Sequence, residues 1–356
     1  MRIVLTGGGT AGHVTPHLAI IPRLLKEGWE IHYIGSENGI EKGLIEPIEG
    51  VTYHGVKTGK FRRYFDLRNF TDPFRVIAGM GQSMKLMKKL KPDIVFSKGG
   101  YVSVPVVYAA AMKKIPSIIH ESDMTSGLAN RLCKPFAKEL LCTFPETAKE
   151  AGEKGLYIGA PIRDELLKGS REKGLKIFGF NDSRPVLLVV GGSLGAQAIN
   201  RAVRGALNEL TKCFQILHIC GKGNVDASFE GKKGYVQMEY LNEEMADAYA
   251  CADVVIGRAG SNTICELLAL RKPSLLIPYP STASRGDQEV DAQSFKLRGF
   301  SRVLDQADLT PDTLVKRVVE VYRDRGQLID AMNREPVTKS ADRIVERIRF
   351  YAKKDA

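Results

Sequence analysis

Short apolar runs alternate with longer amphipathic segments along the whole chain. Apolar runs bounded by glycine and proline predict buried strands, and the amphipathic segments between them predict helices. This alternation indicates an α/β protein whose strands form parallel sheets. The predicted strands lie at residues 2–6, 30–34, 94–97, 117–120 and 139–143, and then at 186–190, 215–219, 236–238, 254–256, 274–277 and 301–304.

The second half of the chain repeats segments of the first half in the same order. Glycine loops at 7–12 (GGGTAG) and 191–195 (GGSLG) each follow a predicted strand. Residues 92–100 (PDIVFSKGG) resemble 252–260 (ADVVIGRAG), and 116–120 (PSIIH) resemble 273–277 (PSLLI). Matched segments in one order are hard to obtain by chance. We therefore expect two similar nucleotide-binding-type domains that face one cleft, and the length of 356 residues fits that number.

The boundary between these domains is expected after residue 163, which gives domains at 1–163 and 164–341. The charged stretch at 168–176 has few apolar residues and is predicted to be the linker. An amphipathic helix is predicted at 342–353, and the final segment, residues 342–356, is expected to pack back on the first domain.

Composition narrows the class of protein. The six cysteines form no CxxC pair and lie mostly in apolar surroundings, which predicts reduced core thiols in a cytosolic protein. The longest apolar stretch, 104–112, is far shorter than the roughly 20 residues that span a bilayer. Because a predicted strand also begins almost at the first residue, we expect neither a secreted nor a membrane-spanning protein.

The formal net charge of +11 indicates an acidic partner. Between residues 57 and 90 basic and large apolar side chains are interleaved, as in segments that bind an anionic membrane surface. A helix at 76–90 that packs on the core is the alternative for the second part of this stretch. Nucleic acid is not an expected partner, because no nucleic-acid-binding motif accompanies the charge. The predicted membrane surface comprises Phe61, Arg62, Arg63, Tyr64, Phe65, Arg68, Phe70, Phe74 and Arg75.

The first glycine loop has the chemistry of a phosphate-binding site. Its glycines permit a tight turn, and the amides at the following helix start favour a diphosphate. Gly7, Gly9 and Gly12 also satisfy the GxGxxG pattern, so an NAD-dependent oxidoreductase is an alternative. Against this alternative, Glu37 comes late for a ribose-binding carboxylate, and the glycine loop at 191–195 would have no role.

His13 lies directly on this loop, at the start of a predicted helix. The helix dipole favours the neutral imidazole, the form that a general base requires. Local capping or packing is the alternative role for His13. A metal shared between His13 and His17 is a lesser alternative, because no carboxylate partner is near in the sequence.

Residues 257–266 (GRAGSNTICE) form the corresponding strand end, glycine turn and helix start of the second half. Amides and hydroxyls there can hold a diphosphate or a uracil edge, and Glu266 can accept hydrogen bonds from two sugar hydroxyls. A helix-capping role is the alternative for Glu266. The polar loop 278–288 could bring Asp287 and Gln288 to the sugar.

These motifs together resemble a known family. The loops at 7–13 (GGGTAGH), 99–105 (GGYVSVP) and 191–196 (GGSLGA) come in the family's order, together with 120–131 (HESDMTSGLANR), 159–163 (GAPIR) and 257–266. The chain resembles, over essentially its whole length, the bacterial N-acetylglucosaminyltransferases that convert lipid I into lipid II. The resemblance implies the GT-B fold, in which two Rossmann-like domains face a cleft.

The resemblance also implies roles for particular residues. His13 is implied as the catalytic base or as an acceptor-binding residue, and Gly9, Tyr101 and Ser103 as acceptor-binding residues. The implied contacts to the donor UDP-GlcNAc are Thr10, Ala11, Gly12, Asp123, Arg163, Ser193, Leu241, Ser261, Asn262, Thr263, Glu266 and Gln288. The sequence departs from the family pattern at Ala11, Ser122, Asp123 and Asp287, where many members have Gly, Gln, Asn and Gln.

The implied reaction is an inverting transfer of GlcNAc to the muramoyl C4 hydroxyl of an undecaprenyl-linked acceptor, without a metal or other cofactor. The implied location is the cytoplasmic face of the cell membrane, where the enzyme binds peripherally to the anionic inner leaflet. Partners in cell-wall synthesis are also implied. A GT-B enzyme that glycosylates another lipid, such as diacylglycerol, and a non-catalytic sugar-nucleotide-binding protein are the alternatives.

Overall fold

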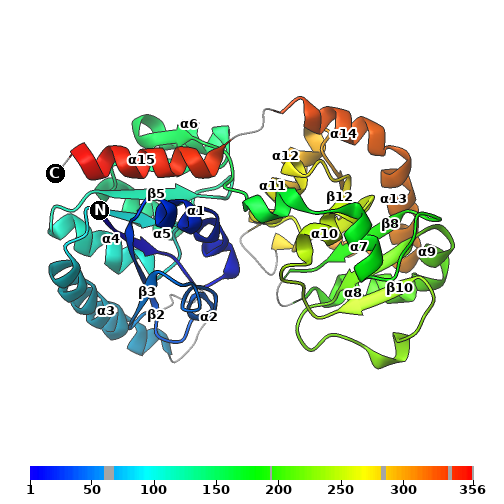
Figure 1. Ribbon diagram of the computed structural model, residues 1–356, viewed down its shortest axis with the longest axis horizontal. Helices are drawn as coiled ribbons and strands as arrows, with labels where there is room; N and C mark the ends of the chain where they lie inside the picture. Colours follow the sequence, from blue (N-terminus) through cyan, green and yellow to red (C-terminus); the bar gives the residue numbers. More distant parts are fainter. Residues whose placement is uncertain (60–67, 193–194, 282–285, 336–338, 355–356) are drawn as a thin grey trace. The chain divides into compact units, whose positions relative to one another are not determined.

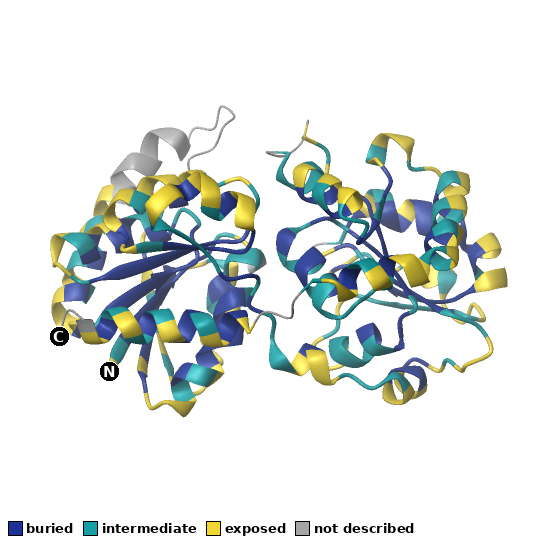
Figure 2. Cartoon of the chain, turned by 90° about the horizontal axis from the view of Figure 1, so that it is seen from above, coloured by how far each residue is buried: buried dark blue, intermediate teal, exposed yellow. Residues whose placement is uncertain are grey.

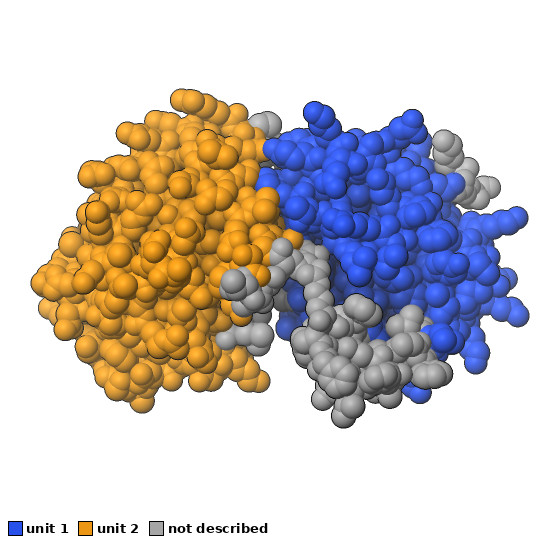
Figure 3. Space-filling model, turned by 180° about the vertical axis from the view of Figure 1, so that it is seen from behind, with its two compact units in different colours: residues 1–162, 338–356 blue, residues 163–337 orange. Residues whose placement is uncertain are grey.

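The structure is a computed structural model that describes residues 1–59, 68–192, 195–281, 286–335 and 339–354. For residues 11, 68–76 and 354 it describes the backbone without the side chain. The chain divides into two compact units, which Figure 3 shows in two colours. Unit 1 comprises Met1–Ile162 and Thr338–Ala356, and unit 2 comprises Arg163–Val337.

Unit 1 contains a seven-stranded parallel sheet with the order β3-β2-β1-β4-β5-β6-β7 (Figure 1). Its central strands are buried on both faces, as Figure 2 shows, and so they are continuous apolar runs in the sequence. The strands are β1 (Arg2–Thr6), β2 (Glu30–Ser36), β3 (Val51–Val56), β4 (Ile94–Ser97), β5 (Ser117–Glu121), β6 (Glu139–Cys142) and β7 (Gly155–Tyr157).

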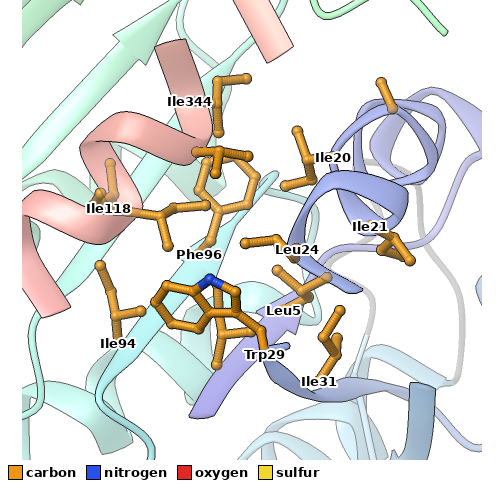
Figure 4. Close-up of a cluster of buried hydrophobic side chains, with 14 of the residues drawn as sticks. Leu5, Ile20, Ile21, Leu24, Trp29, Ile31, Ile94, Phe96, Ile118 and Ile344 are labelled. Carbon is orange, nitrogen blue, oxygen red and sulfur yellow. The ribbon is translucent and has the colours of Figure 1, made fainter. Parts of the chain in front are cut away.

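Helices cover both faces of this sheet (Figure 1). On one face α1 (Thr15–Lys26) and α15 (Ser340–Lys354) pack on side chains of β1, β4 and β5, and Figure 4 shows Leu5, Phe96 and Ile344 in that cluster. On the other face α3 (Arg68–Leu90) and α4 (Ser103–Met112) pack around Val4 and Val95. The other α-helices of unit 1 are α2 (Ile40–Ile45), α5 (Leu128–Cys133) and α6 (Pro145–Ala151).

Unit 2 has the same plan with a six-stranded parallel sheet, β10-β9-β8-β11-β12-β13. Its strands are β8 (Val186–Val190), β9 (Gln215–Ile219), β10 (Tyr235–Met238), β11 (Val254–Gly257), β12 (Ser274–Leu276) and β13 (Arg302–Val303). Its α-helices are α7 (Arg171–Ile177), α8 (Gln197–Gly205), α9 (Leu207–Cys213), α10 (Met245–Cys251), α11 (Ser261–Ala269), α12 (Asp287–Leu297), α13 (Pro311–Arg323) and α14 (Arg325–Asn333). Two Rossmann-like parallel-sheet units confirm the predicted fold class.

The predicted linker at 168–176 is wrong, because this stretch forms helix α7 and packs on α10 inside unit 2. The backbone amide of Ser170 donates to Asp247 Oδ1 at 2.7 Å, and Arg171 Nη1 donates to the Cys251 carbonyl at 2.8 Å. A Cβ on Gly174 would lie 2.4 Å from the Asp247 carbonyl oxygen, so the two helices approach closely through this glycine. The charged residues of the stretch are the solvent-facing side of a packed helix.

Strand β3 was not among the predicted strands, and β7 lies in the segment 155–161, whose sequence (GLYIGAP) indicates both strand and turn. Both contain glycine and polar residues, and most of their side chains are partly exposed. In the part of the chain that the structure describes, no helix combines the length and the apolar character needed to cross a membrane.

Candidate functional site

The glycine loops lie where the strand order of each sheet reverses. In unit 1 the first glycine loop, residues 7–13, follows β1, and the second glycine loop, residues 99–105, follows β4. Strands β1 and β4 are adjacent. In unit 2 the loops at 191–196 and 258–261 follow the adjacent strands β8 and β11. Crevices outside the carboxyl ends of such strands are the usual ligand sites of doubly wound sheets.

The first loop is held in place from below by Glu41, a fully buried carboxylate on α2. Glu41 accepts hydrogen bonds from the backbone amides of Gly9 at 3.2 Å and Ser36 at 2.9 Å. The Tyr33 hydroxyl donates to the Gly7 carbonyl at 2.9 Å. A Cβ on Gly8 would lie 2.5 Å from the Glu41 carboxylate, so a larger residue at this position would displace that side chain.

The first and second loops touch each other through their glycines. Gly100 has a φ of +83°, and a Cβ there would lie 2.2 Å from the Gly8 carbonyl oxygen and 3.2 Å from His13 Nδ1. Gly9 has a φ of +89°, and a Cβ there would lie 2.6 Å from the Tyr101 ring. The fold therefore brings together Gly9, His13 and Tyr101, which the sequence assigned to the same half of the site.

His13 ends a short 3₁₀ turn, Ala11–His13, directly before α1. Its Nδ1 lies 3.1 Å from the Gly8 carbonyl oxygen and 3.1 Å from Thr10 Oγ1. Because a carbonyl oxygen only accepts, Nδ1 carries the proton in the neutral ring, and Nε2 then carries the lone pair that a base needs.

His17 lies beneath the loop and is fully buried. Burial, and then the positive charge of Lys98, lower the pKa of His17 to about 3, so its ring is neutral. Its Nδ1 lies 3.3 Å from the Tyr33 hydroxyl, which gives this histidine a partner in the core. Among the residues that the structure describes, no three His, Cys, Asp or Glu side chains form a metal-binding group.

Ser103 and Asp123 lie on the same edge of unit 1. The buried Ser103 hydroxyl donates to the Gly99 carbonyl at 2.7 Å, so it stabilises the turn of the second loop. Asp123 follows β5, and its backbone amide donates to Glu121 Oε1 at 3.1 Å. Glu121 and Glu41, which organise these loops, were not singled out in the sequence analysis.

In unit 2, helix α11 begins at the glycine turn and carries four of the predicted donor contacts. Ser261, Asn262 and Thr263 form its first turn, after the N-cap residue Gly260. Glu266 lies one turn further on, with its Oε1 3.8 Å from Arg163 Nη2. The Tyr249 hydroxyl approaches Glu266 Oε2 at 3.5 Å.

Burial raises the pKa of Glu266 to about 7, against the opposing charge of Arg163 and the hydrogen bond from Tyr249. The Nε atom of Arg163 is buried and has no hydrogen-bond partner in the structure. Glu266 and Arg163 therefore form a half-buried pair of charged groups beside the start of α11.

The other predicted donor contacts of unit 2 lie on neighbouring loops. Gln288, in the first turn of α12, accepts from the Tyr279 amide at 3.0 Å and so fixes the loop after β12. Leu241 follows β10 and is partly exposed. Arg258, which the sequence analysis did not single out, donates to the Ile277 and Pro278 carbonyls at 3.0 and 3.1 Å.

The glycine loop after β8 is fixed by a close approach to the next strand end. Gly195 has a φ of +75°, and a Cβ there would lie 2.0 Å from the Cys220 carbonyl oxygen. Ser193, the predicted diphosphate contact on this loop, lies outside the described residues, and the side chain of Ala11 does as well.

The predicted membrane surface also falls outside the described part of the chain. Phe61, Arg62, Arg63, Tyr64 and Phe65 belong to the segment 60–67. The backbone of Arg68, Phe70, Phe74 and Arg75 forms the first turns of α3, and their side chains are not described.

Comparisons with known proteins agree with this architecture. Residues 3–142 match the Glycosyltransferase family 28 N-terminal domain, and residues 186–348 match the Glycosyltransferase family 28 C-terminal domain. The crystal structure of Acinetobacter baumannii MurG is similar with a TM-score of 0.76 and 25% identity, covering 98% of this chain and 99% of that one. The calicheamicin glycosyltransferase CalG4 shares the fold with a TM-score of 0.74 at 12% identity, covering 100% of this chain and 99% of that one.

Two Rossmann-like units with these loops and these domain matches define a glycosyltransferase of the GT-B class. The chain is 54% identical, over 99% of both chains, to the UDP-N-acetylglucosamine–N-acetylmuramyl-(pentapeptide) pyrophosphoryl-undecaprenol N-acetylglucosamine transferase of Lachnospira eligens. It is 54% identical, over 97% of both chains, to the transferase of the same name from Lachnoclostridium phytofermentans. The chain belongs to this family of N-acetylglucosamine transferases.

Proposed function

We propose that this chain transfers N-acetylglucosamine from UDP-GlcNAc to the muramoyl C4 hydroxyl of undecaprenyl-diphospho-N-acetylmuramoyl-pentapeptide, lipid I, which gives lipid II. The observation that carries the proposal is the identity of 54%, over nearly all of both chains, to transferases whose names give this donor and acceptor. The glycine loops of the two units supply the sites that two diphosphate-bearing substrates need.

Unit 2 binds the donor in this proposal. Glu266 accepts hydrogen bonds from two hydroxyls of the nucleotide, beside the α11 start at Ser261, Asn262 and Thr263. Arg163, 3.8 Å from Glu266, neutralises charge on the diphosphate. Ser193, Leu241 and Gln288 complete the contacts of unit 2, and Thr10, Ala11, Gly12 and Asp123 supply those of unit 1.

Unit 1 binds the acceptor, with its diphosphate on Gly9, Tyr101 and Ser103. His13 takes the proton of the C4 hydroxyl through Nε2, because Nδ1 donates to the Gly8 carbonyl. The hydroxyl oxygen forms a bond to the anomeric carbon while the bond from that carbon to the UDP oxygen breaks. The departing UDP keeps the electron pair, and amides at the start of α8 stabilise its charge. Attack from the opposite face inverts the anomeric configuration.

The acceptor lipid places the enzyme on the inner leaflet of the cell membrane, at its cytoplasmic face. In unit 1 helix α4 packs on α5 and on the 3₁₀ turn Lys134–Phe136, and all three expose apolar side chains. The Tyr108 and Phe136 rings meet there at 4.8 Å between centroids. We call this surface the α4–α5 apolar patch; it comprises Tyr108, Met112, Leu128, Leu132 and Phe136. Exposed Lys113, Lys114, Arg131 and Lys138 adjoin it in the sequence, and this composition suits an anionic lipid surface.

The activity is tested with radiolabelled UDP-GlcNAc and a short-chain lipid I analogue. We expect a labelled disaccharide lipid from the wild-type protein, and a fall in kcat of about 10²- to 10⁴-fold for His13→Ala, with UDP binding unchanged. His54→Gln is the matched control, since His54 lies on the edge strand β3 and its ring meets His32. Labelling of a different lipid, with lipid I ignored, would contradict the acceptor assignment.

Membrane docking is tested by sedimentation with phospholipid vesicles. We expect the protein to pellet with anionic vesicles and to remain in solution with neutral ones. Leu132→Asp should reduce pelleting, whereas Leu297→Asp, on an exposed position of unit 2, should leave it unchanged. Equal loss in both variants would contradict the role of the α4–α5 apolar patch.

A further inference from the structure

The segment that follows β5, residues 122–127, is organised by one carboxylate. Glu121 is the last residue of β5 and only 4% exposed. Its Oε1 accepts from the Asp123 amide at 3.1 Å, and its Oε2 accepts from the Gly127 amide at 2.9 Å. The two ends of the loop therefore converge on a single side chain.

Asn130, on α5, completes this arrangement and is also 4% exposed. Its Nδ2 donates to Glu121 Oε2 at 2.9 Å and to the His120 carbonyl at 3.0 Å. The Thr147 hydroxyl, on α6, fixes the outer part of the loop through the Met124 carbonyl at 2.8 Å. The Glu121 carboxylate thus serves three N–H donors.

The same asparagine lies behind the second glycine loop. Gly99 has a φ of +86°, and a Cβ there would lie 3.1 Å from Asn130 Oδ1 and 3.2 Å from Asn130 Nδ2. The next residue, Gly100, abuts the Gly8 carbonyl and His13 Nδ1. A continuous series of contacts therefore runs from Glu121 through Asn130 and the second loop to His13.

We infer that Glu121 and Asn130 are positioning residues of the acceptor half, which set the loop 122–127 and the second glycine loop against His13. The inference rests on the proposed function, in which the second glycine loop receives the acceptor while Asp123, on the loop 122–127, contacts the donor. Both Glu121 oxygens are occupied by N–H donors and the side chain is buried, so the carboxylate acts through the loops rather than on the substrate. Removing it leaves buried donors unsatisfied, and the loops shift to satisfy them.

The test is a set of steady-state measurements on Glu121→Gln and Asn130→Ala with UDP-GlcNAc and a short-chain lipid I analogue. Loop displacement should lower kcat/KM for the acceptor by about 10- to 100-fold. The KM for UDP-GlcNAc should rise less than the acceptor effect, because one proposed donor contact, Asp123, lies on the displaced loop while unit 2 carries most of the others. Glu150→Gln, an exposed carboxylate on α6 of the same unit, is the matched control and should match the wild type in both substrates.

The double variant Glu121→Gln/Asn130→Ala tests whether the two residues act as a unit. Its loss in acceptor kcat/KM should be smaller than the product of the two single losses, because each single change already releases the loops. Asn130→Ala removes only one of the three N–H donors to Glu121, so it supplies the comparison if Glu121→Gln does not fold.

Three results would overturn the inference. The first is a Glu121→Gln variant that behaves like Glu150→Gln. The second is an equal rise in both KM values with a lowered unfolding midpoint, which would mean a general loss of structure. The third is a loss of kcat at unchanged acceptor KM that Asn130→Ala does not share, which would mean direct chemistry by Glu121. A wild-type protein that leaves lipid I unglycosylated would instead contradict the proposed function itself.

Discussion

In the proposed donor complex Glu266 binds the nucleotide, and the same carboxyl group also takes up a proton near neutral pH. Its carboxyl group lies beside Arg163 and Tyr249, and burial raises its pKa to about 7. In the proposed donor complex only the ionised carboxylate can accept both hydroxyl hydrogen bonds. The ionised form predominates above the pKa and is lost as the pH falls through about 7.

We therefore predict that UDP-GlcNAc binds more tightly at pH 8 than at pH 6. Below the pKa of Glu266 the dissociation constant should rise by up to about tenfold for each pH unit. Isothermal titration calorimetry at pH 6, 7 and 8 measures this dependence. Glu266→Gln should bind weakly at every pH with a flat profile, and Glu209→Gln, an exposed carboxylate on α9, should keep the wild-type profile. A pH profile in Glu266→Gln as steep as that of the wild type would refute the assignment.

The residues that the sequence analysis missed share one physical property. Glu41, Glu121 and Tyr249 act through hydrogen bonds that only the fold forms: those of Glu41 and Tyr249 to the Gly9 amide and the Glu266 carboxylate join distant residues, and those of Glu121 lie within or beside the loop after β5. The sequence pattern around one residue holds no information on which partner the folded chain gives it. Loop residues such as His13 and Tyr101 could be predicted, because glycine-rich turns after apolar strands mark a ligand-binding position in the sequence itself.

At the scale of elements, the glycine loops work as a pair of interlocked turns. Gly100 combines a positive φ with a close approach to the first loop, while Gly28 has a φ of +76° and nothing within 4 Å of its Cβ position. An L-residue at either position would have a backbone strain of about 1–2 kcal/mol. At Gly100 it would also clash with the first loop, so a comparison of the two positions isolates the effect of that clash.

We predict that Gly100→Ala lowers kcat/KM for the acceptor by at least about tenfold, because the methyl group displaces Gly8 and with it His13. Gly28→Ala carries a similar backbone strain at the end of α1 and should retain activity. Steady-state assays with varied acceptor, together with thermal unfolding of both variants, measure the difference. Similar activity in both variants would mean that the loops need no direct contact.

Element prediction succeeded where burial on both faces makes a strand continuously apolar, as in β1, β4 and β8. It failed for β3, whose sequence VTYHGV mixes polar and apolar residues because the strand lies at the edge of the sheet. It also failed for α7, whose lysines and arginine look like a linker until the small residue Gly174 is seen against α10. Edge strands and short surface helices have compositions close to those of loops.

At the scale of the whole molecule, the last helix belongs to the first unit. Helix α15 places Ile344 and Ile348, both fully buried, in one hydrophobic cluster. Figure 4 shows Ile344 there with Phe96 and Ile118. Arg343 donates to the Tyr157 carbonyl at 2.9 Å, and Arg347 Nε donates to Glu139 at 2.8 Å. The repeat in the sequence indicated two sheets, and the amphipathic pattern of α15 indicated a buried face for it.

We predict that Ile348→Ala destabilises unit 1 by about 2–5 kcal/mol, because the substitution leaves a cavity in this cluster. Denaturant unfolding measured with and without UDP separates the units, since ligand bound to unit 2 stabilises that unit. Only the unit 1 transition should move. Ile77→Ala, at a position that is 69% exposed in the same unit, should change it by less than about 0.5 kcal/mol.

The return of α15 to unit 1 also fixes an order of assembly during protein synthesis. The ribosome completes every residue of unit 2, Arg163–Val337, before it makes α15. Because domains fold as units while the chain emerges, the donor half can close its core while the acceptor half still exposes the part of its apolar face that α15 covers. The half whose synthesis begins first thus completes its core last.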